Sequence, residues 1–351
     1  MRKVLLLCLA LTLPLGAQQA KNVILFLGDA GGVATLNGAS ILGHGEPQKL
    51  YIQSMPHIGL SDTSSASQWV SDSAAGMTAV VTGQKTHNGV VSQGPDAVRG
   101  TTDGAPLKTI LEYAEERGLS TGVLTNVTFT DATPAATYAQ VNDRGDFARI
   151  FRQFLAPRFG DGVDVLIGPG LAAVDQKLAA EGATVAGLMK TSGRPLYDSL
   201  EAIPSDAERA VALFPSRNDF NLPRAVERAI DILSKNPNGF FLMVEGDMHT
   251  DDIEAGLRRA LELDAIIRAT ALRMPHDDTL IVFTADHSFD LLVSGGRKGE
   301  PVVVGAGIRV GGSHTGEEVV VAAQGPGSER VRGYMPNTQI FHIMMQAYGW
   351  E

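Results

Sequence analysis

Unbroken apolar runs recur along the chain, and several lead directly into polar residues. Residues 22–28 are followed by Asp29, and residues 279–283 are followed by Thr284-Ala285-Asp286-His287. An apolar run without alternation indicates a strand that is buried on both faces, as in a parallel sheet. The same pattern predicts further strands over residues 122–124, 163–167, 240–244 and 319–321.

Between these runs the apolar residues recur with helical spacing. The helices expected from it cover residues 107–117, 147–155, 223–234, 253–274 and 337–348. Alternating strands and helices predict an α/β fold, a three-layer sandwich with a mostly parallel central sheet flanked by helices. Residues 171–222 carry the weakest pattern and are expected to form peripheral helices and loops. Ligands of such sheets bind beyond the carboxyl ends of the strands. The polar residues expected there are Asp29, Glu245, Asp286 and His287.

The first residues have the pattern of a secretory leader. Arg2 and Lys3 precede an apolar run over residues 4–13, and small residues follow at 16–17. This arrangement predicts a signal peptide over residues 1–17. We expect cleavage near residues 17–20, a single domain over residues 21–351, and a periplasmic or secreted protein. The apolar run is too short to span a bilayer, so no membrane span is expected.

Composition narrows the choice of partners and of stabilising features. The chain of 351 residues has a formal net charge of −10, and its one cysteine, Cys8, lies inside the predicted leader. A mature domain without cysteine forms no disulfide, so its core and any bound metals must hold it together. The acidic balance argues against binding of a nucleic-acid backbone. An acidic net charge is compatible with a small pocket that metals and one arginine make locally positive.

The small-residue run Ser73-Ala74-Ala75-Gly76 predicts the start of a tightly packed helix. A hydroxyl at this place faces free backbone N–H groups and the positive end of the helix dipole. Phosphate binds readily at such a site, and a serine there is placed to attack it. By itself this segment makes Ser73 a candidate nucleophile. The neighbouring Trp69 is expected in the core or in the wall of the pocket.

Carboxylates and imidazoles at strand ends are ligands that suit zinc and magnesium. Asp286-His287 gives the strongest signal of this kind. Asp29, in the turn Gly28-Asp29-Ala30-Gly31-Gly32, gives a weaker one, because glycine-rich turns often carry an aspartate for structural reasons alone. An ordinary turn at the end of a strand remains the alternative for both segments.

Seven segments together resemble the alkaline phosphatase family, and they occur in the order of that family. They are Gly28-Asp29-Ala30, Asp72-Ser73-Ala74, residues 82–89, residues 131–135, Val244-Glu245-Gly246, residues 284–287 and His314-Thr315-Gly316. The resemblance implies a phosphomonoesterase that hydrolyses small-molecule phosphate monoesters. It also implies a phosphoserine intermediate on Ser73, two zinc ions and one magnesium ion. Since many relatives are homodimers, a homodimer is the assembly that the resemblance suggests.

The same resemblance assigns roles to single residues. The carboxylate of Asp29 matches the one that bridges one zinc and the magnesium. That zinc site is completed by Asp286 and His287. The other magnesium ligands implied are Asp131, Thr133 and Glu245. His314 matches a histidine on the first zinc. Arg144, thirteen residues after Asp131, matches the arginine that binds two phosphate oxygens.

The chain departs from the family pattern after Glu245. The family has an aspartate about five residues after this glutamate and a histidine four residues further on. An alignment without a gap puts Thr250 and the pair Ile253-Glu254 at these places, leaving the first zinc with His314 alone. A four-residue deletion instead aligns His249 with the family histidine and makes Asp247 the replacement carboxylate. An Asp-x-His pair on an extended turn points both side chains to one side, so we expect Asp247 and His249 to complete the site.

Three other functions can be weighed against this one. A sulfatase needs a cysteine or serine followed at two residues by proline and then arginine, and Ser73-Ala74-Ala75-Gly76 lacks both. A phosphodiesterase of the same superfamily stays open, because no residue clearly rejects a second ester group. A catalytically impaired relative that binds zinc or phosphate also stays open, because residues 247–249 are irregular.

Overall fold

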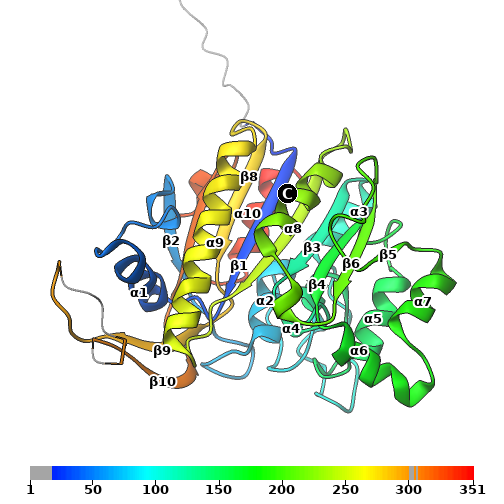
Figure 1. The fold of residues 1–351 in the computed structure, drawn as a ribbon, viewed down its shortest axis with the longest axis horizontal. Helices are drawn as coiled ribbons and strands as arrows, with labels where there is room; N and C mark the ends of the chain where they lie inside the picture. Colours follow the sequence, from blue (N-terminus) through cyan, green and yellow to red (C-terminus); the bar gives the residue numbers. More distant parts are fainter. Residues whose placement is uncertain (1–17, 300–303, 306) are drawn as a thin grey trace, which may run out of the picture.

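The computed structural model describes residues 18–299, 304–305 and 307–351, so the leader predicted over residues 1–17 lies outside it. A ten-stranded sheet with the order β12-β2-β11-β8-β1-β7-β3-β4-β6-β5 runs through the middle of the molecule (Figure 1). Its strands are β1 (Asn22–Asp29), β2 (His57–Ser61), β3 (Ser120–Thr125), β4 (Val165–Pro169), β5 (Leu196–Tyr197), β6 (Ala210–Phe214), β7 (Phe240–Asp247), β8 (Thr279–Thr284), β11 (Val319–Gln324) and β12 (Gly333–Met335).

A separate two-stranded antiparallel sheet is formed by β9 (Ser288–Val293) and β10 (Ile308–Thr315). The α-helices are α1 (Val33–His44), α2 (Ser73–Thr82), α3 (Ile110–Glu116), α4 (Ala132–Tyr138), α5 (Phe147–Leu155), α6 (Leu171–Leu178), α7 (Val185–Ser192), α8 (Leu222–Leu233), α9 (Ile253–Arg273) and α10 (Gln339–Ala347). Within the described residues, none of the helices combines the length and apolar character needed to cross a bilayer.

Strand β1 lies at the centre of the large sheet, parallel to β7 on one side and to β8 on the other. All eight residues of β1 and all eight of β7 are buried. Successive β1 side chains face opposite sides, so Val23 and Leu25 enter one apolar cluster while Ile24 and Phe26 enter the other. Burying each large apolar side chain contributes about 1.5–3 kcal/mol, which explains why these runs contain no polar residue before their ends.

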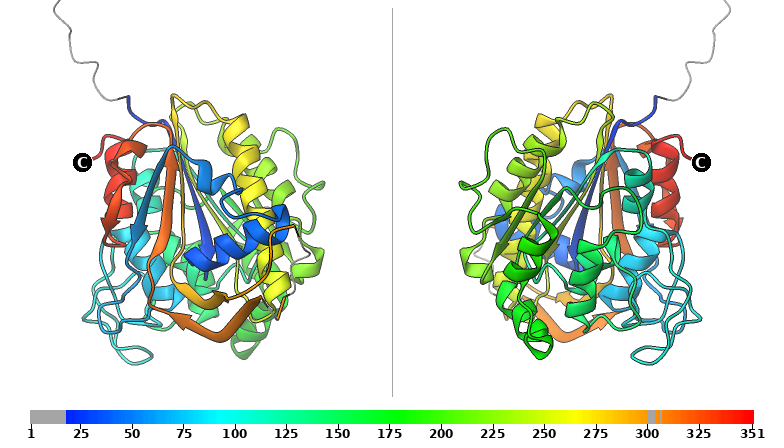
Figure 2. Two further views of the ribbon diagram at one scale, coloured as in Figure 1. Left: turned by 90° about the vertical axis from the view of Figure 1, so that its left-hand side faces the viewer. Right: turned by 90° about the vertical axis from the view of Figure 1, so that its right-hand side faces the viewer.

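Helices cover both faces of the sheet. The side views show α9 on one face, with α2 and α10 on the other (Figure 2). One apolar cluster contains side chains of α1, α8 and α9, and the second contains those of α2, α3, α4, α5 and α10. The α/β three-layer sandwich with a mostly parallel sheet, expected from the sequence, is thereby confirmed.

The predicted strands and helices are all present, with ends that shift by a few residues. The sequence did not predict β6, a fully buried strand within residues 171–222. The strand has only five residues, Ala-Val-Ala-Leu-Phe, and two of them are alanine, which has low strand propensity. The sequence also did not predict β2, which lies next to the edge strand β12 and has only two buried residues among its five.

Candidate active site

The polar residues at the carboxyl ends of β1, β7 and β8 lie side by side. Asp29 is in register with Asp247, and Leu27 is in register with Glu245 on one side and Thr284 on the other. The strand ends therefore stop at the same level, and the residues that follow meet at one edge of the sheet. Asp286 and His287 come immediately after β8 and reach the same place.

The nucleophile expected from the sequence opens helix α2. The helix begins at Ser73, and the Asp72 carboxylate caps it by accepting the backbone N–H of Ala75 at 3.1 Å. The Ser73 side chain is only 3% exposed, and its Oγ lies 3.3 Å from Nε2 of His287. The hydroxyl thus sits at the positive end of the helix dipole and beside the strand ends.

One group of converging ligand atoms is formed by Asp29, Asp286 and His287. These residues are all buried, and one ligand atom from each lies within 4.8 Å of the others. His287 Nε2 lies 3.3 Å from Asp29 Oδ1 and 3.7 Å from Asp286 Oδ2. Burial, opposed by Asp286, lowers the pKa of His287 to about 4, so its imidazole is neutral and suited to metal binding.

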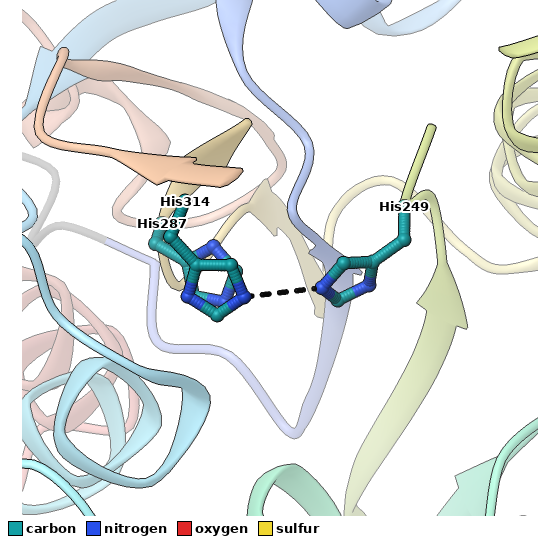
Figure 3. A group of neighbouring side chains, drawn as sticks. All are labelled: His249, His287 and His314. Carbon is teal, nitrogen blue, oxygen red and sulfur yellow. Dashed lines mark hydrogen bonds between the residues drawn. The ribbon is translucent and has the colours of Figure 1, made fainter. Parts of the chain in front are cut away.

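A second group is formed by the imidazoles of His249, His287 and His314 (Figure 3). His249 lies on the turn between β7 and α9, and its Nε2 faces Nε2 of His314 at 3.4 Å. His314 pairs with Phe289 across the β9–β10 ladder, two residues from His287, and the rings of the two histidines stack with centroids 3.7 Å apart. Nδ1 of each ring lies 2.8–3.3 Å from a protein oxygen. These oxygens assign the proton to Nδ1 and leave Nε2 as an acceptor, so the facing nitrogens fit a shared cation.

Buried polar atoms without a hydrogen-bond partner provide an independent test of a metal site. In the described part of the chain, four of them belong to residues assigned to metals, namely Asp29 Oδ1, Thr133 Oγ1, Glu245 Oε1 and Asp286 Oδ2. A buried polar atom left unpaired costs about 1–3 kcal/mol. Cations at these atoms remove that cost, so the residues present fit the metals that the sequence implies.

Crowding of carboxylates strengthens this conclusion. Burial, aided by Asp286, Glu245, Asp247 and Asp131, raises the pKa of Asp29 well above its usual range. Burial, together with Asp131 and Asp286, raises the pKa of Glu245 to about 8, although Thr125 donates a hydrogen bond to its Oε2 at 2.5 Å. Buried carboxylates with such raised pKa values are stabilised by a positive ion.

Arg144 lies beside the nucleophile and is held by two carboxylates. Its Nη1 donates to Asp72 at 3.0 Å and its Nη2 donates to Asp131 at 2.9 Å. Although burial opposes the charge, Asp131 and Asp72 raise the pKa of Arg144 above its ordinary value. Asp72 and Asp131 also cap helices α2 and α4, so the guanidinium is fixed relative to both. Its side chain remains 24% exposed, which leaves an edge open to a ligand.

The alkaline phosphatase family model matches residues 20–175 and 201–310. The chain belongs to the alkaline phosphatase family. The alkaline phosphatase of Gadus morhua is 32% identical over 336 residues, which cover 78% of this chain and 70% of the relative. Streptomycin-6-phosphate phosphatase of Streptomyces griseus is 30% identical over 420 residues, covering 95% of this chain and 92% of the relative.

The chain spans only about three fifths of the length of several animal relatives that it matches. The match spans 58% of alkaline phosphatase 4 of Drosophila melanogaster and 64% of the human tissue-nonspecific isozyme, which is 31% identical. Among solved structures, the alkaline phosphatase of the Antarctic bacterium TAB5 superposes with a TM-score of 0.79 at 25% identity, covering 96% of this chain and 100% of that one. That of Thermus thermophilus, at 22% identity and a TM-score of 0.79, shares the fold.

Six of the seven alkaline phosphatase segments quoted from the sequence contribute residues to this edge of the sheet, whereas residues 82–89 start at the far end of α2 and return only with Gly89, whose N–H donates to Asp72. Trp69 differs from expectation, because it is 89% exposed and forms neither core nor pocket wall.

Asp247 lies where the sequence put it, yet its two oxygens accept from His249 and Arg217. Arg217 and Arg259 beside it were not predicted, since neither lies in a family segment. The capping role of Asp72 was readable, because an aspartate directly before a helix is a common N-cap.

Proposed function

We propose that this chain is a phosphomonoesterase that hydrolyses small phosphate monoesters, with Ser73 as the nucleophile. The observation that carries the proposal is the Ser73 hydroxyl, which opens α2 and lies 3.3 Å from His287 within the converging ligand atoms. Asp29, Asp286 and His287 would hold one zinc ion, and His249 with His314 would hold the other. The magnesium ion would be held by Asp29, Asp131, Thr133 and Glu245.

Zinc and magnesium bound there would neutralise phosphate charge and lower the pKa of a bound hydroxyl. Ser73 Oγ, once its proton has passed to water, attacks phosphorus; the bond from phosphorus to the ester oxygen breaks, and the leaving oxygen takes up a proton. Water then attacks the phosphoserine, which releases inorganic phosphate and restores the hydroxyl. Positioning of the reacting groups and electrostatic stabilisation together account for most of the catalysis in phosphoryl transfer.

Arg144 would bind two non-bridging phosphate oxygens through the N–H groups that Asp72 and Asp131 leave free. Because those carboxylates fix the guanidinium, it does not need to reorganise during the reaction. The backbone N–H groups at the start of α2 would add further donors to the same phosphate.

The proposal includes a single catalytic domain over residues 21–351, formed after removal of the leader and located in the periplasm or outside the cell. These statements, and the homodimer suggested by the resemblance, rest on the sequence. The substrate class follows from the family resemblance, and the acidic net charge of the chain argues against nucleic acid.

Hydrolysis of p-nitrophenyl phosphate between pH 7 and 10 tests the proposal. The protein is assayed after metal removal, after return of zinc and magnesium, and as the Ser73→Ala variant. Turnover that needs metals and vanishes in the variant would support a phosphomonoesterase. Faster hydrolysis of bis(p-nitrophenyl) phosphate would indicate a phosphodiesterase. Bound zinc without turnover on either ester would indicate the impaired relative.

A further inference from the structure

The carboxylate of Asp247 is fully occupied by donors of the protein itself. Its Oδ1 lies 2.8 Å from His249 Nδ1 and accepts the backbone N–H of His249 at 2.9 Å. Its Oδ2 accepts from Arg217 Nη1 at 2.7 Å, and Arg259 Nε lies 3.4 Å away. Arg217 belongs to the short 3-10 helix Arg217–Asp219 that follows β6. Both oxygens therefore have partners other than a metal.

The backbone around Asp247 is held as firmly as its side chain. Arg259 on α9 donates through Nε to the carbonyl of Asp247 at 2.9 Å and through Nη2 to that of His249 at 2.7 Å. The amide of Asp247 donates to Asn126 Oδ1 at 2.9 Å. A β-carbon on Gly256 would lie 2.3 Å from the carbonyl oxygen of His249, so α9 packs directly on this turn. The carboxylate cannot swing toward the histidines without disrupting these contacts.

In all three histidines Nδ1 lies close to a protein oxygen, and for His249 that oxygen belongs to Asp247. Nδ1 of His287 lies 3.1 Å from the carbonyl of Ser288, and Nδ1 of His314 lies 3.3 Å from that of Ser71. For His249 the corresponding oxygen is Oδ1 of Asp247. A histidine that binds a metal through one nitrogen usually donates from the other to a carbonyl or carboxylate. Among the described residues, Asp247 belongs to neither group of converging ligand atoms.

We propose that Asp247 is a positioning residue that fixes the ring and tautomer of His249, and that it is not a ligand of the first zinc. The protein ligands of that zinc are then His249 and His314 alone. This inference rests on the proposed function, because it concerns the same metal site. It departs from the expectation that Asp247 replaces the carboxylate ligand of the family.

Two protein ligands leave at least two of the four usual zinc positions open to water or phosphate. The zinc held by His249 and His314 is therefore expected to dissociate before the zinc held by Asp29, Asp286 and His287. A chelator titration of the full protein should show two steps, with apparent affinities at least tenfold apart. Removal of the weaker zinc should leave the fold intact.

The decisive test compares Asp247→Ala with Asp247→Asn. The asparagine oxygen can still accept from His249 Nδ1, whereas a neutral amide is a poor zinc ligand. Because its NH2 group would face Arg217, the asparagine variant is also made together with Arg217→Gln, whose oxygen can accept from that amide. His249→Ala serves as the variant that loses the first site. Zinc affinity is measured by chelator competition, and the ligand set by the visible spectrum of the Co(II)-substituted protein.

If Asp247 positions His249, Asp247→Ala lowers the affinity of the weaker zinc about 10- to 100-fold. At least one asparagine variant then restores that affinity to within about threefold of the original chain and keeps its Co(II) spectrum. If all Asp247 variants lose the weaker zinc as His249→Ala does, Asp247 is a ligand and the inference is wrong. Occupancy of the second zinc in each variant shows that the variant is folded.

This test also separates the inference from the proposed function. All its readouts concern metal binding, so they stay valid if the protein binds two zinc ions and hydrolyses no ester, which would overturn the function alone. If the original chain binds no zinc through His249 and His314, the inference and the metal site fail together.

Discussion

Gly76 of helix α2 packs against the backbone of Asp286 so closely that a β-carbon on Gly76 would lie 2.4 Å from the Asp286 carbonyl oxygen. The helix that carries the nucleophile is therefore seated directly on the segment that carries Asp286 and His287. Ser71, just before the helix, also donates to the same carbonyl at 3.3 Å. Glycine at position 76 thus sets the distance between Ser73 and the proposed zinc ligands.

Gly76→Ala should damage activity by moving this helix. Relieving the clash requires a backbone shift, and overpacking of this kind costs about 1–3 kcal/mol. We expect a lower melting temperature and at least a tenfold loss of kcat/KM on p-nitrophenyl phosphate. Gly187→Ala is the matched control, because a β-carbon at this exposed position of α7 would meet only the Thr184 hydroxyl, at 3.1 Å. Equal effects of the two substitutions would contradict the prediction.

Ser73→Ala should abolish turnover while leaving metal binding intact. Among the described residues the Ser73 hydroxyl is hydrogen-bonded to His287 alone, so its removal takes away the nucleophile and little else. We expect kcat to fall by about a thousandfold or more, with unchanged zinc content and melting temperature. Ser67→Ala, at an exposed position of the same loop, should behave like the original chain. A Ser73→Ala protein with more than a tenth of the activity would rule out the serine nucleophile.

Arg144→Ala should be less damaging than Ser73→Ala, because Arg144 positions phosphate and forms no covalent bond. Loss of charge-assisted hydrogen bonds worth about 1.5–3 kcal/mol corresponds to a 10- to 100-fold fall in kcat/KM. Arg144→Lys should recover only part of it, since lysine cannot bind two oxygens in a fixed fork. Arg149→Ala, which removes an exposed pair with Asp103, is the control. Equal activity of the alanine variants at 144 and 149 would contradict the role.

The metal-free protein should lose stability as the pH rises from about 6.5 to about 8. The pKa of Glu245 is raised by burial from 4.5 to about 8, and that of Asp29 is raised as well. A carboxyl with a raised pKa binds more protons in the folded chain than in the unfolded one, so stability falls across the interval between the two values. Below about 6.5, His287, whose pKa is lowered by burial to about 4, acts in the opposite direction.

Melting temperatures with and without zinc and magnesium measure this effect. Burial also raises the pKa of Glu115 to about 7, but this residue lies outside the metal site and contributes equally to both samples. The fall between pH 6.5 and 8 should therefore be larger without metals, and Glu245→Gln should reduce it. A metal-free protein that becomes more stable over this interval would show that these carboxylates are not forced together as described.

Much of the fold was predictable because its central strands are buried on both faces. In β1 and β7 no polar residue interrupts the run until the strand end, so the pattern gave both the strand and the place where chemistry begins. The sequence did not predict strand β6 because the strand has only five residues and two of them are alanine. Trp69 was placed wrongly because the apolar character of one residue does not determine its burial.

The candidate site was predictable where its functional residues lie in short contiguous segments of the sequence. Ser73 and Asp286-His287 belong to runs whose local sequence suggests their surroundings. The environment of Asp247 was not predictable, because Arg217 lies thirty residues before it and Arg259 twelve residues after it, in segments with no shared pattern. Only the tertiary structure shows that these arginines reach Asp247 and its backbone.

The position of β1 in the sheet has a consequence for how the chain is made. Among the described strands β1 is the earliest in the sequence, and both of its partners, β7 and β8, follow more than 200 residues later. Until those partners are available, the chain carries an unpaired strand in which residues 23–27 are all apolar, and exposed segments of this kind favour aggregation. Pairings between distant parts of a chain also form slowly. Correct assembly therefore requires residues 240–284, and a chain that ends before residue 240 lacks both of the strands that pair with β1.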